Sequence, residues 1–214
     1  VVGIVLGVYI GTIVLLNIPN IQQAMSVFVA EELSEVLNTK VVIGRINMGL
    51  LNRIIIDDVL LDDQSGQEML KVTRLSAKFD IMPFFKGKIS ISSVQLFGFN
   101  INLRKETPDS PPNFKFVLDA FASKDTVKKE NSLDLRINSI LIRRGRMSYH
   151  VLSEEETPGK FNAKHIQLQN IIANISLKAL SKDSLNLGIK RLSLDEKASG
   201  FSLKKMSRSE EHTS

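Results

Sequence analysis

Histidine and cysteine are the side chains that most often carry hydrolytic or metal-dependent chemistry, and this sequence has few of them. It contains three histidines and no cysteine. His150 and His165 are separated by an expected loop and strand, and no metalloprotease, serine-hydrolase or nucleotide-binding spacing accompanies them. We therefore expect a protein that is not an enzyme and that uses no cofactor and no metal ion.

Two acidic pairs are the next candidates for chemistry. Asp57-Asp58 and Asp62-Asp63, together with Glu68, offer the hard oxygen ligands that calcium prefers. The ligand order of an EF-hand loop is absent, and Asp57-Asp58 fills a polar pair in the strand repeat described below. We expect these carboxylates to occupy polar positions of the fold and not to hold calcium.

The densest basic cluster is Arg143, Arg144 and Arg146. It lacks the interleaved aromatic residues and the recognisable motifs of nucleic-acid-binding proteins, so we expect no nucleic-acid partner. A solvated strand end is the preferred interpretation. If the cluster binds a ligand, an anionic headgroup is the partner that fits it.

The composition of the 214-residue chain excludes several classes of protein. It has 28 basic and 23 acidic side chains, a net charge of +5, 43% hydrophobic residues and no tryptophan. A disulfide scaffold, a zinc-thiolate protein, a collagen and a long disordered chain are excluded. Residues 208–214 resemble the translation of a sequencing-library adapter, and we expect this tail to be unpacked and foreign to the natural gene.

The N-terminal segment predicts a membrane anchor. Val1 to Leu16 contains nothing more polar than Tyr9 and Thr12, and it is followed by the helix-exit sequence Asn17 to Asn20. At 1.5 Å per residue such a helix spans about 24 Å of a roughly 30 Å hydrocarbon core. We interpret residues 1–20 as a truncated transmembrane anchor. The alternative is the apolar part of a cleaved signal peptide, but no small-residue cleavage site follows.

Residues 21–39 form the one convincing amphipathic helix, because apolar side chains recur there at spacings of three and four. We expect this helix to pack over the open end of the structure that follows. Its acidic polar face disfavours a helix lying on a membrane, since anionic lipids attract Lys and Arg. The expected apolar face comprises Ile21, Met25, Phe28, Val29, Leu33, Val36 and Leu37, and the expected polar face comprises Gln22, Glu31, Glu32 and Glu35.

After Lys40 a single hydrophobic pattern recurs at seven places. Two apolar residues in alternation are followed by a polar pair and then by two more apolar residues in alternation, as in Val41/Ile43/Ile46/Met48. The seven middle pairs contain no apolar residue: they are Gly44-Arg45, Asp57-Asp58, Thr73-Arg74, Ser92-Ser93, Asn138-Ser139, Gln169-Asn170 and Lys190-Arg191.

This spacing predicts strands that each carry a β-bulge. Alternation of period two keeps side chains on one face, and the pair in the middle changes the phase, which a bulge accommodates while it bends the strand. The abundance of Ile and Val and the short intervals argue against helices. We predict a mainly β fold, a curved antiparallel meander that forms an open groove. Its parts are a first groove segment at 40–106, an insertion at 107–131 with a short apolar segment from Phe114 to Phe121, and a continuing groove at 132–207.

An N-terminal apolar helix, a short helix and this strand pattern resemble the beginning of an AsmA-like protein. Within that superfamily the chain is most similar to the TamB family, the inner-membrane component of the translocation and assembly module. The resemblance covers about residues 1–121 and rests on degenerate hydrophobic spacings. The segments that carry it are Val41 to Ile46, Val59 to Gly66, Met82 to Lys88, Ile91 to Leu103 and Pro112 to Phe114.

The resemblance implies a β-taco-like bridge for outer-membrane biogenesis, held in the bacterial inner membrane by a single-pass helix, with the bulk of the chain in the periplasm. We expect its apolar groove to carry phospholipid acyl chains between the two membranes. The alternative is a scaffold for the insertion or secretion of outer-membrane β-barrel proteins, which would pair strands with an outer-membrane β-barrel partner. An ordinary sandwich core would produce the same alternation.

The alternating residues identify the side chains expected to line this groove. Polar neighbours at Ser90, Asn100 and Asn102 are expected to point away from it, because successive residues of a strand face opposite sides. The expected lining residues are Met48, Leu61, Leu75, Ala77, Phe79, Ile91, Phe97, Phe99, Ile101 and Leu103.

Overall fold

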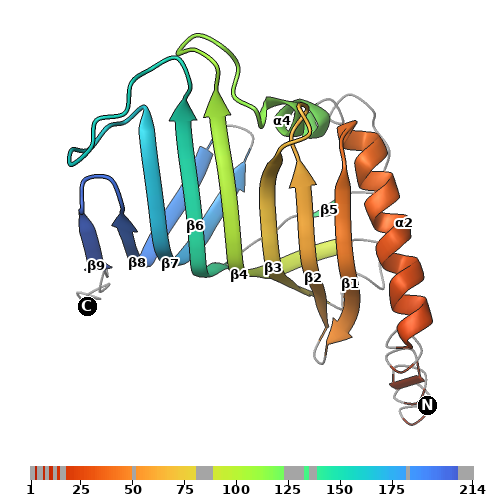
Figure 1. The fold of residues 1–214 in the computed structure, drawn as a ribbon. Coiled ribbons are helices and arrows are strands. Elements are labelled where there is room, and N and C mark those ends of the chain that lie inside the picture. The colour runs from red at the N-terminus through yellow and green to blue at the C-terminus, as the bar shows by residue number, and fades with distance from the viewer. Residues whose placement is uncertain are drawn as a thin grey trace, which may run out of the picture.

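One open, curved β-sheet dominates the fold, which confirms the expected mainly β class (Figure 1). The structure, a computed structural model, describes residues 3, 7, 10, 11, 14, 18–49, 52–80, 89–122, 133–134, 139–181 and 184–206. Its elements are α2 (Pro19–Leu37), β1 (Val41–Gly49), β2 (Arg53–Asp62), β3 (Glu68–Phe79), β4 (Ile89–Lys105), α4 (Lys115–Ala122), β5 (Leu133–Asp134), β6 (Ser139–Val151), β7 (His165–Ser181), β8 (Ser184–Glu196) and β9 (Ser202–Met206).

The strand order is β1-β2-β3-β4-β6-β7-β8-β9, with β5 paired to β4 off this path. Neighbours within β1–β4 and within β6–β9 are antiparallel, as expected. The expected pure meander is wrong at the junction, because β4 and β6 are parallel. The chain between them, residues 106–138, is long enough to return to the end of the sheet where β4 began. The two expected groove segments therefore form one continuous sheet.

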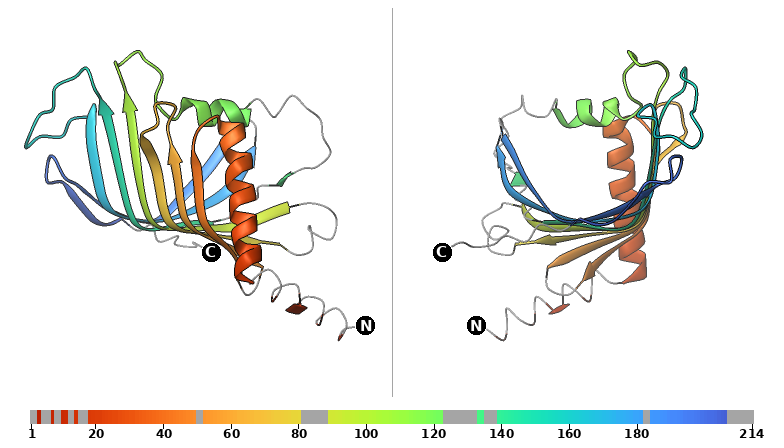
Figure 2. Two further views of the ribbon diagram at one scale, coloured as in Figure 1. Left: turned by 45° about the vertical axis from the view of Figure 1, so that its right-hand side comes forward. Right: turned by 90° about the vertical axis from the view of Figure 1, so that its left-hand side faces the viewer.

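A row of irregular positions crosses the sheet at the level of the predicted bulges. Asp58 (φ 56°) and Asn170 (φ 53°) have left-handed backbone conformations inside predicted polar pairs. Gly98 (φ 64°) on β4 and Arg144 (φ 55°) on β6 have the same backbone conformation. The pairing between neighbouring strands leaves out these residues, as it leaves out Asp58. Each irregularity bends its strand. Because the bends are aligned across neighbouring strands, the whole sheet curves around one concave side (Figure 2).

Other predicted polar pairs match irregularities in the ladder. Ser92 is a surplus residue between the paired positions Ile91 and Ser93, and Lys190 is a surplus residue between Ile189 and Arg191. The pairs Gly44-Arg45 and Thr73-Arg74 lie in the aligned row without a shift of register. Asn138, in the fifth repeat, lies outside the described residues.

Helix α2 confirms the predicted amphipathic helix, and Asn38 ends it in a left-handed conformation (φ 48°). It begins at Pro19, so the expected helix exit at Asn17 to Asn20 is wrong: Pro19 and Asn20 form the first turn of α2. Its predicted faces are partly wrong. Phe28 is 62% exposed and Val36 is 39% exposed, whereas Gln22 and Ser26 are buried. The Ser26 hydroxyl donates to the Gln22 carbonyl oxygen at 2.8 Å, so the helix satisfies this buried hydroxyl internally.

The helices cover the β1 end of the sheet. The predicted apolar segment from Phe114 to Phe121 forms most of α4, and residues of α2 and α4 pack with the apolar side chains of β1, β2 and β3 in one cluster. Figure 2 shows both helices on the concave side of the sheet. The apolar face of the sheet, which carries Ile56, Leu70 and Leu103 of this cluster, is therefore the concave face.

Two expectations about the ends of the chain fall on undescribed residues. The predicted anchor Val1 to Leu16 lies mostly outside the described residues, and so does the 208–214 tail. In the part of the chain that the structure describes, no helix combines the length and the apolar character needed to cross a membrane.

The contact between Phe99 and Gly145 yields a stability prediction. A Cβ atom on Gly145 would lie 2.3 Å from Cζ of Phe99, whose side chain is only 6% exposed. Gly145→Ala should therefore lower the free energy of unfolding, measured by urea denaturation, by about 1–3 kcal/mol. The double variant with Phe99→Leu should recover part of this loss, because the smaller side chain vacates the space. Strictly additive single effects would contradict the proposed contact.

Candidate functional site

The apolar concave face is the candidate functional site, and strand register places most of the predicted lining residues on it. Leu75 pairs with Ile56 and Leu96, and Ala77 pairs with Ile54 and Val94, so these positions share one face. The same pairing extends this face to the other predicted lining residues except Phe97: Met48, Leu61, Phe79, Ile91, Phe99, Ile101 and Leu103.

The placement of Phe97 on this face is wrong. Phe97 pairs with Arg74 and Arg143 on the opposite side of the sheet, and it is 38% exposed. The carbon of the Arg144 guanidinium lies 5.1 Å from its ring centroid, within range of a cation–π interaction. The left-handed Gly98 changes the side-chain phase between Phe97 and Phe99, and simple alternation cannot reveal that change.

The polar neighbours lie away from the apolar face, as expected, where the structure describes them. Asn100 pairs with Lys71 and Arg146. The Asn102 side chain donates to the Glu68 carbonyl oxygen at 3.1 Å and accepts from the Ser148 hydroxyl at 3.0 Å. The Ser90 side chain lies outside those that the structure describes.

Burial divides the lining residues into two groups. Leu61 and Phe99 are 7% and 6% exposed, so they belong to the core of the sheet. Met48, Leu75, Ala77, Phe79, Ile91, Ile101 and Leu103 are only partly buried. The apolar cluster around Val72, Phe99 and Ile171 contains residues of strands only. At this part of the face, the described chain supplies no second layer of helices or strands.

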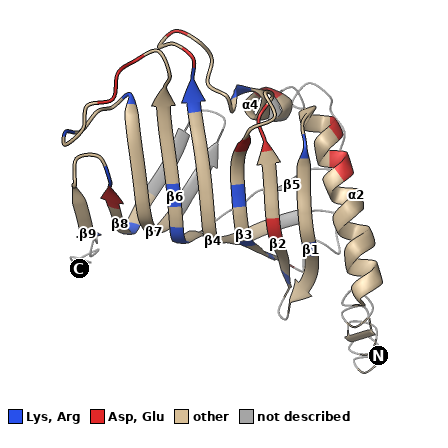
Figure 3. Ribbon diagram, in the orientation of Figure 1, with Lys and Arg blue, Asp and Glu red and all other residues tan. Residues whose placement is uncertain are grey.

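The opposite, convex face carries charge. Charged residues of β2, β3 and β6 form a band across the sheet near the aligned bulges (Figure 3). Asp57 accepts from Arg74 Nε at 2.6 Å, so this carboxylate has an arginine partner. Arg143, Arg144 and Arg146 are exposed in the middle of β6, and not at a strand end as expected. Arg144 and Arg146 border a shallow depression of about 400 Å³.

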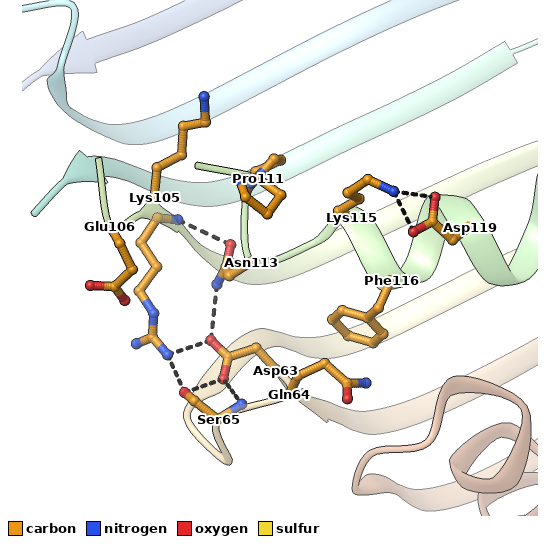
Figure 4. Close-up of a pocket in the computed structure, with 12 residues that line it drawn as sticks. Asp63, Gln64, Ser65, Lys105, Glu106, Pro111, Asn113, Lys115, Phe116 and Asp119 are labelled. Carbon is orange, nitrogen blue, oxygen red and sulfur yellow. Dashed lines mark hydrogen bonds and ion pairs between the residues drawn. The ribbon is translucent and has the colours of Figure 1, made fainter. Parts of the chain in front are cut away.

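At one end of the strands, the buried Asp63 organises a polar network (Figure 4). Its side chain is 2% exposed and lies 2.6 Å from the Arg104 guanidinium. Asn113 donates to Asp63 at 3.0 Å, and the backbone N–H of Ser65 donates at 3.0 Å. This network joins the β2–β3 turn, the end of β4 and the segment that leads into α4 beside a pocket of about 340 Å³.

The network keeps Asp63 ionised. Burial acts to raise the pKa of Asp63, but hydrogen bonds from the side chains of Ser65 and Asn113 and from the backbone N–H groups of Gln67 and Ser65 outweigh it. The net result is a pKa below the ordinary value of 3.8. Asp63 therefore remains a charged structural partner of Arg104 at neutral pH.

A second buried carboxylate, Glu196, closes the β8–β9 turn. It is 3% exposed and accepts hydrogen bonds from the backbone N–H groups of Gln167, Ala198 and Ser199. Burial acts to raise its pKa, and the hydrogen bonds from Ser199, Ala198 and Gln167 outweigh burial and lower the pKa to about 2. Glu196 thus ties the turn to the start of β7.

The structure also brings together two residues that the sequence kept apart. His150 lies one residue before the end of β6, and His165 begins β7. The two histidines are paired across the neighbouring strands. The expected strand between them is wrong, because residues 152–164 form a loop of turns with one isolated bridge. If residues 152–164 had been predicted to form the loop of a β-hairpin, His150 and His165 would have been expected to be neighbours.

Comparisons with protein-family models, with curated proteins and with solved structures give no match.

The Asp63 network predicts a large loss of stability on neutralisation. Asp63→Asn leaves Arg104 without its counter-charge in a largely buried setting, so the free energy of unfolding should fall by about 3 kcal/mol. The matched control is Asp119→Asn, which breaks the exposed Lys115–Asp119 ion pair and should cost about 0.3–0.5 kcal/mol. Equal effects of the two variants in urea denaturation would contradict the structural role of Asp63.

The lowered pKa of Glu196 predicts that the free energy of unfolding falls in acid. The unfolded chain protonates this carboxyl near its ordinary pKa of 4.5, whereas the folded chain holds it ionised down to about 2. Its contribution to stability is therefore complete above pH 4.5 and is lost as the pH falls toward 2. Glu196→Gln should flatten the dependence of unfolding free energy on pH in this window. An unchanged slope would contradict the lowered pKa.

Proposed function

We propose that this protein is an inner-membrane-anchored periplasmic bridge that carries phospholipid acyl chains along the concave apolar face of its sheet. The observation that carries the proposal is the strand-only cluster around Val72, Phe99 and Ile171, flanked by partly buried apolar side chains. An apolar face without a second protein layer needs a hydrophobic occupant. Burial of each methylene of an acyl chain contributes about 0.8 kcal/mol, so a partial groove suffices to hold a lipid tail out of water.

The compartment and the partners in this proposal come from the resemblance to AsmA-like proteins. The uncharged N-terminal segment would serve as the single-pass inner-membrane anchor. Helix α2 would then place the β1 end of the sheet next to the membrane, since α2 directly follows the anchor and packs against β1. An outer-membrane β-barrel protein would receive the far end of the bridge.

The β1 edge of the sheet favours lipid over protein as the cargo. The Ser34 hydroxyl accepts from the backbone N–H of Val41 at 3.0 Å, and α2 packs along β1. A covered edge resists the addition of further strands, which a scaffold for β-barrel proteins would require.

Site-specific photocrosslinking tests the cargo directly. A photoreactive residue at Ile101, partly buried on the apolar face, should crosslink to phospholipid in the intact protein. The matched control is Asn100, the preceding residue, which faces the other side of the sheet. Crosslinks to protein alone from Ile101, or equal lipid crosslinks from both positions, would contradict the proposal.

A substitution at the same position separates transport from folding. Ile101→Asp places a charge on the acyl path and should abolish phospholipid transfer between vesicles, while Asn100→Asp should leave transfer unchanged. Because Ile101 is only partly buried, circular dichroism should show a folded sheet in both variants. Phe99 is unsuitable for this test, because a charge at that buried position would unfold the protein.

A further inference from the structure

A cluster of metal-ligating atoms lies where β6 and β7 meet, away from the apolar face described above. Nδ1 of His150 and Nδ1 of His165 are 3.1 Å apart. Glu156, on the loop that joins the two strands, places Oε1 at 3.7 Å from His150 Nδ1 and 4.0 Å from His165 Nδ1. All three ligand atoms lie within 4.8 Å of one another, and within the described residues this is the one group of three such side chains.

The protein fixes the tautomer of the buried histidine. His165 is 7% exposed, and its Nε2 lies 2.9 Å from the backbone carbonyl oxygen of Glu154. A carbonyl only accepts, so Nε2 carries the proton and Nδ1 of neutral His165 presents a lone pair toward His150 and Glu156. An outer carbonyl that orients one ring nitrogen while the other stays free is the usual second shell of a metal-bound histidine.

The spacing of the three atoms fits a small divalent ion. Metal–ligand bonds of about 2.0–2.2 Å in a tetrahedral site place ligand atoms about 3.3 Å apart. The two imidazole nitrogens already have nearly this separation. Glu156 Oε1 needs to move less than about 1 Å toward the two nitrogens to complete the set. Its side chain is 63% exposed on a loop, so this movement is open to it.

The neighbouring charges leave these ligands available. Glu154 is occupied by an ion pair with Lys164 at 2.6 Å, so the lysine charge is compensated beside the site. Two imidazoles and one carboxylate form the ligand set of zinc-class ions, whereas calcium and magnesium prefer oxygen ligands alone.

We propose that His150, Glu156 and His165 bind one divalent transition-metal ion of the zinc class, with a fourth position left to solvent. The ion would take the place of the proton that His150 Nδ1 shares with His165 Nδ1. That proton would move to Nε2 of His150. It would also tie the loop of residues 152–164 to the ends of β6 and β7. The site is independent of the proposed lipid path, because its ligands lie at the strand ends and in the loop.

Metal titration of the full chain, purified in mild detergent and stripped with a chelator, tests the proposal. Cobalt(II), whose visible absorption reports tetrahedral coordination by nitrogen and oxygen, should bind with a stoichiometry of one and should be displaced by zinc(II). Zinc should also raise the melting temperature, since an ion that binds only the folded state stabilises it. Absence of binding by the intact protein would overturn the proposal.

Paired variants distinguish this site from adventitious metal binding. Glu156→Gln should weaken binding at least about tenfold and leave the fold intact, because the side chain is exposed. Glu155→Gln and His212→Gln, which alter a neighbouring carboxylate and the third histidine, should bind like the unmodified protein. His150→Gln combined with His165→Gln should abolish binding. Retention of full affinity by this double variant or by Glu156→Gln would overturn the assignment.

Discussion

The structure depends on one constraint: a strand must bend sharply while keeping its large apolar side chains on the same side. A two-residue alternation cannot do this alone, because an inserted residue reverses every side chain beyond it. Irregular positions at Asp58, Gly98, Arg144 and Asn170, all with positive φ, absorb the change of phase. Their alignment across neighbouring strands turns separate bends into the curvature of the whole sheet.

This curvature concentrates apolar area on the concave side and charge on the convex side. At the β1 end, α2 and α4 supply the second layer that an amphipathic sheet normally needs. Further along, the cluster around Phe99 is held by strand residues alone, and the close approach of Phe99 to Gly145 makes this part dense. Side chains pack tightly at the bend, and those beside the bend are partly exposed. The same face can therefore be both a stable core and a candidate binding surface.

The two buried carboxylates lie at turns and strand ends. Asp63 and Glu196 each accept several hydrogen bonds that hold a turn, and each is kept ionised against the effect of its burial. The histidine pair and Glu156 stand at another strand connection. The concave face thus has an apolar middle, while the buried carboxylates and the histidine pair lie at the ends of the strands.

The sequence alone indicated most of the long strands, the amphipathic helix and several bulge positions, because period-two alternation and its interruption are local properties of the chain. It missed the irregular positions at Gly98 and Arg144. It also determined which face nearly all the lining residues share. It could not place Phe97, since the conformation of Gly98 sets that phase. Nor could it reveal the parallel pairing of β4 with β6 or the meeting of His150 with His165. Those contacts depend on where long connections return, and only tertiary packing decides that.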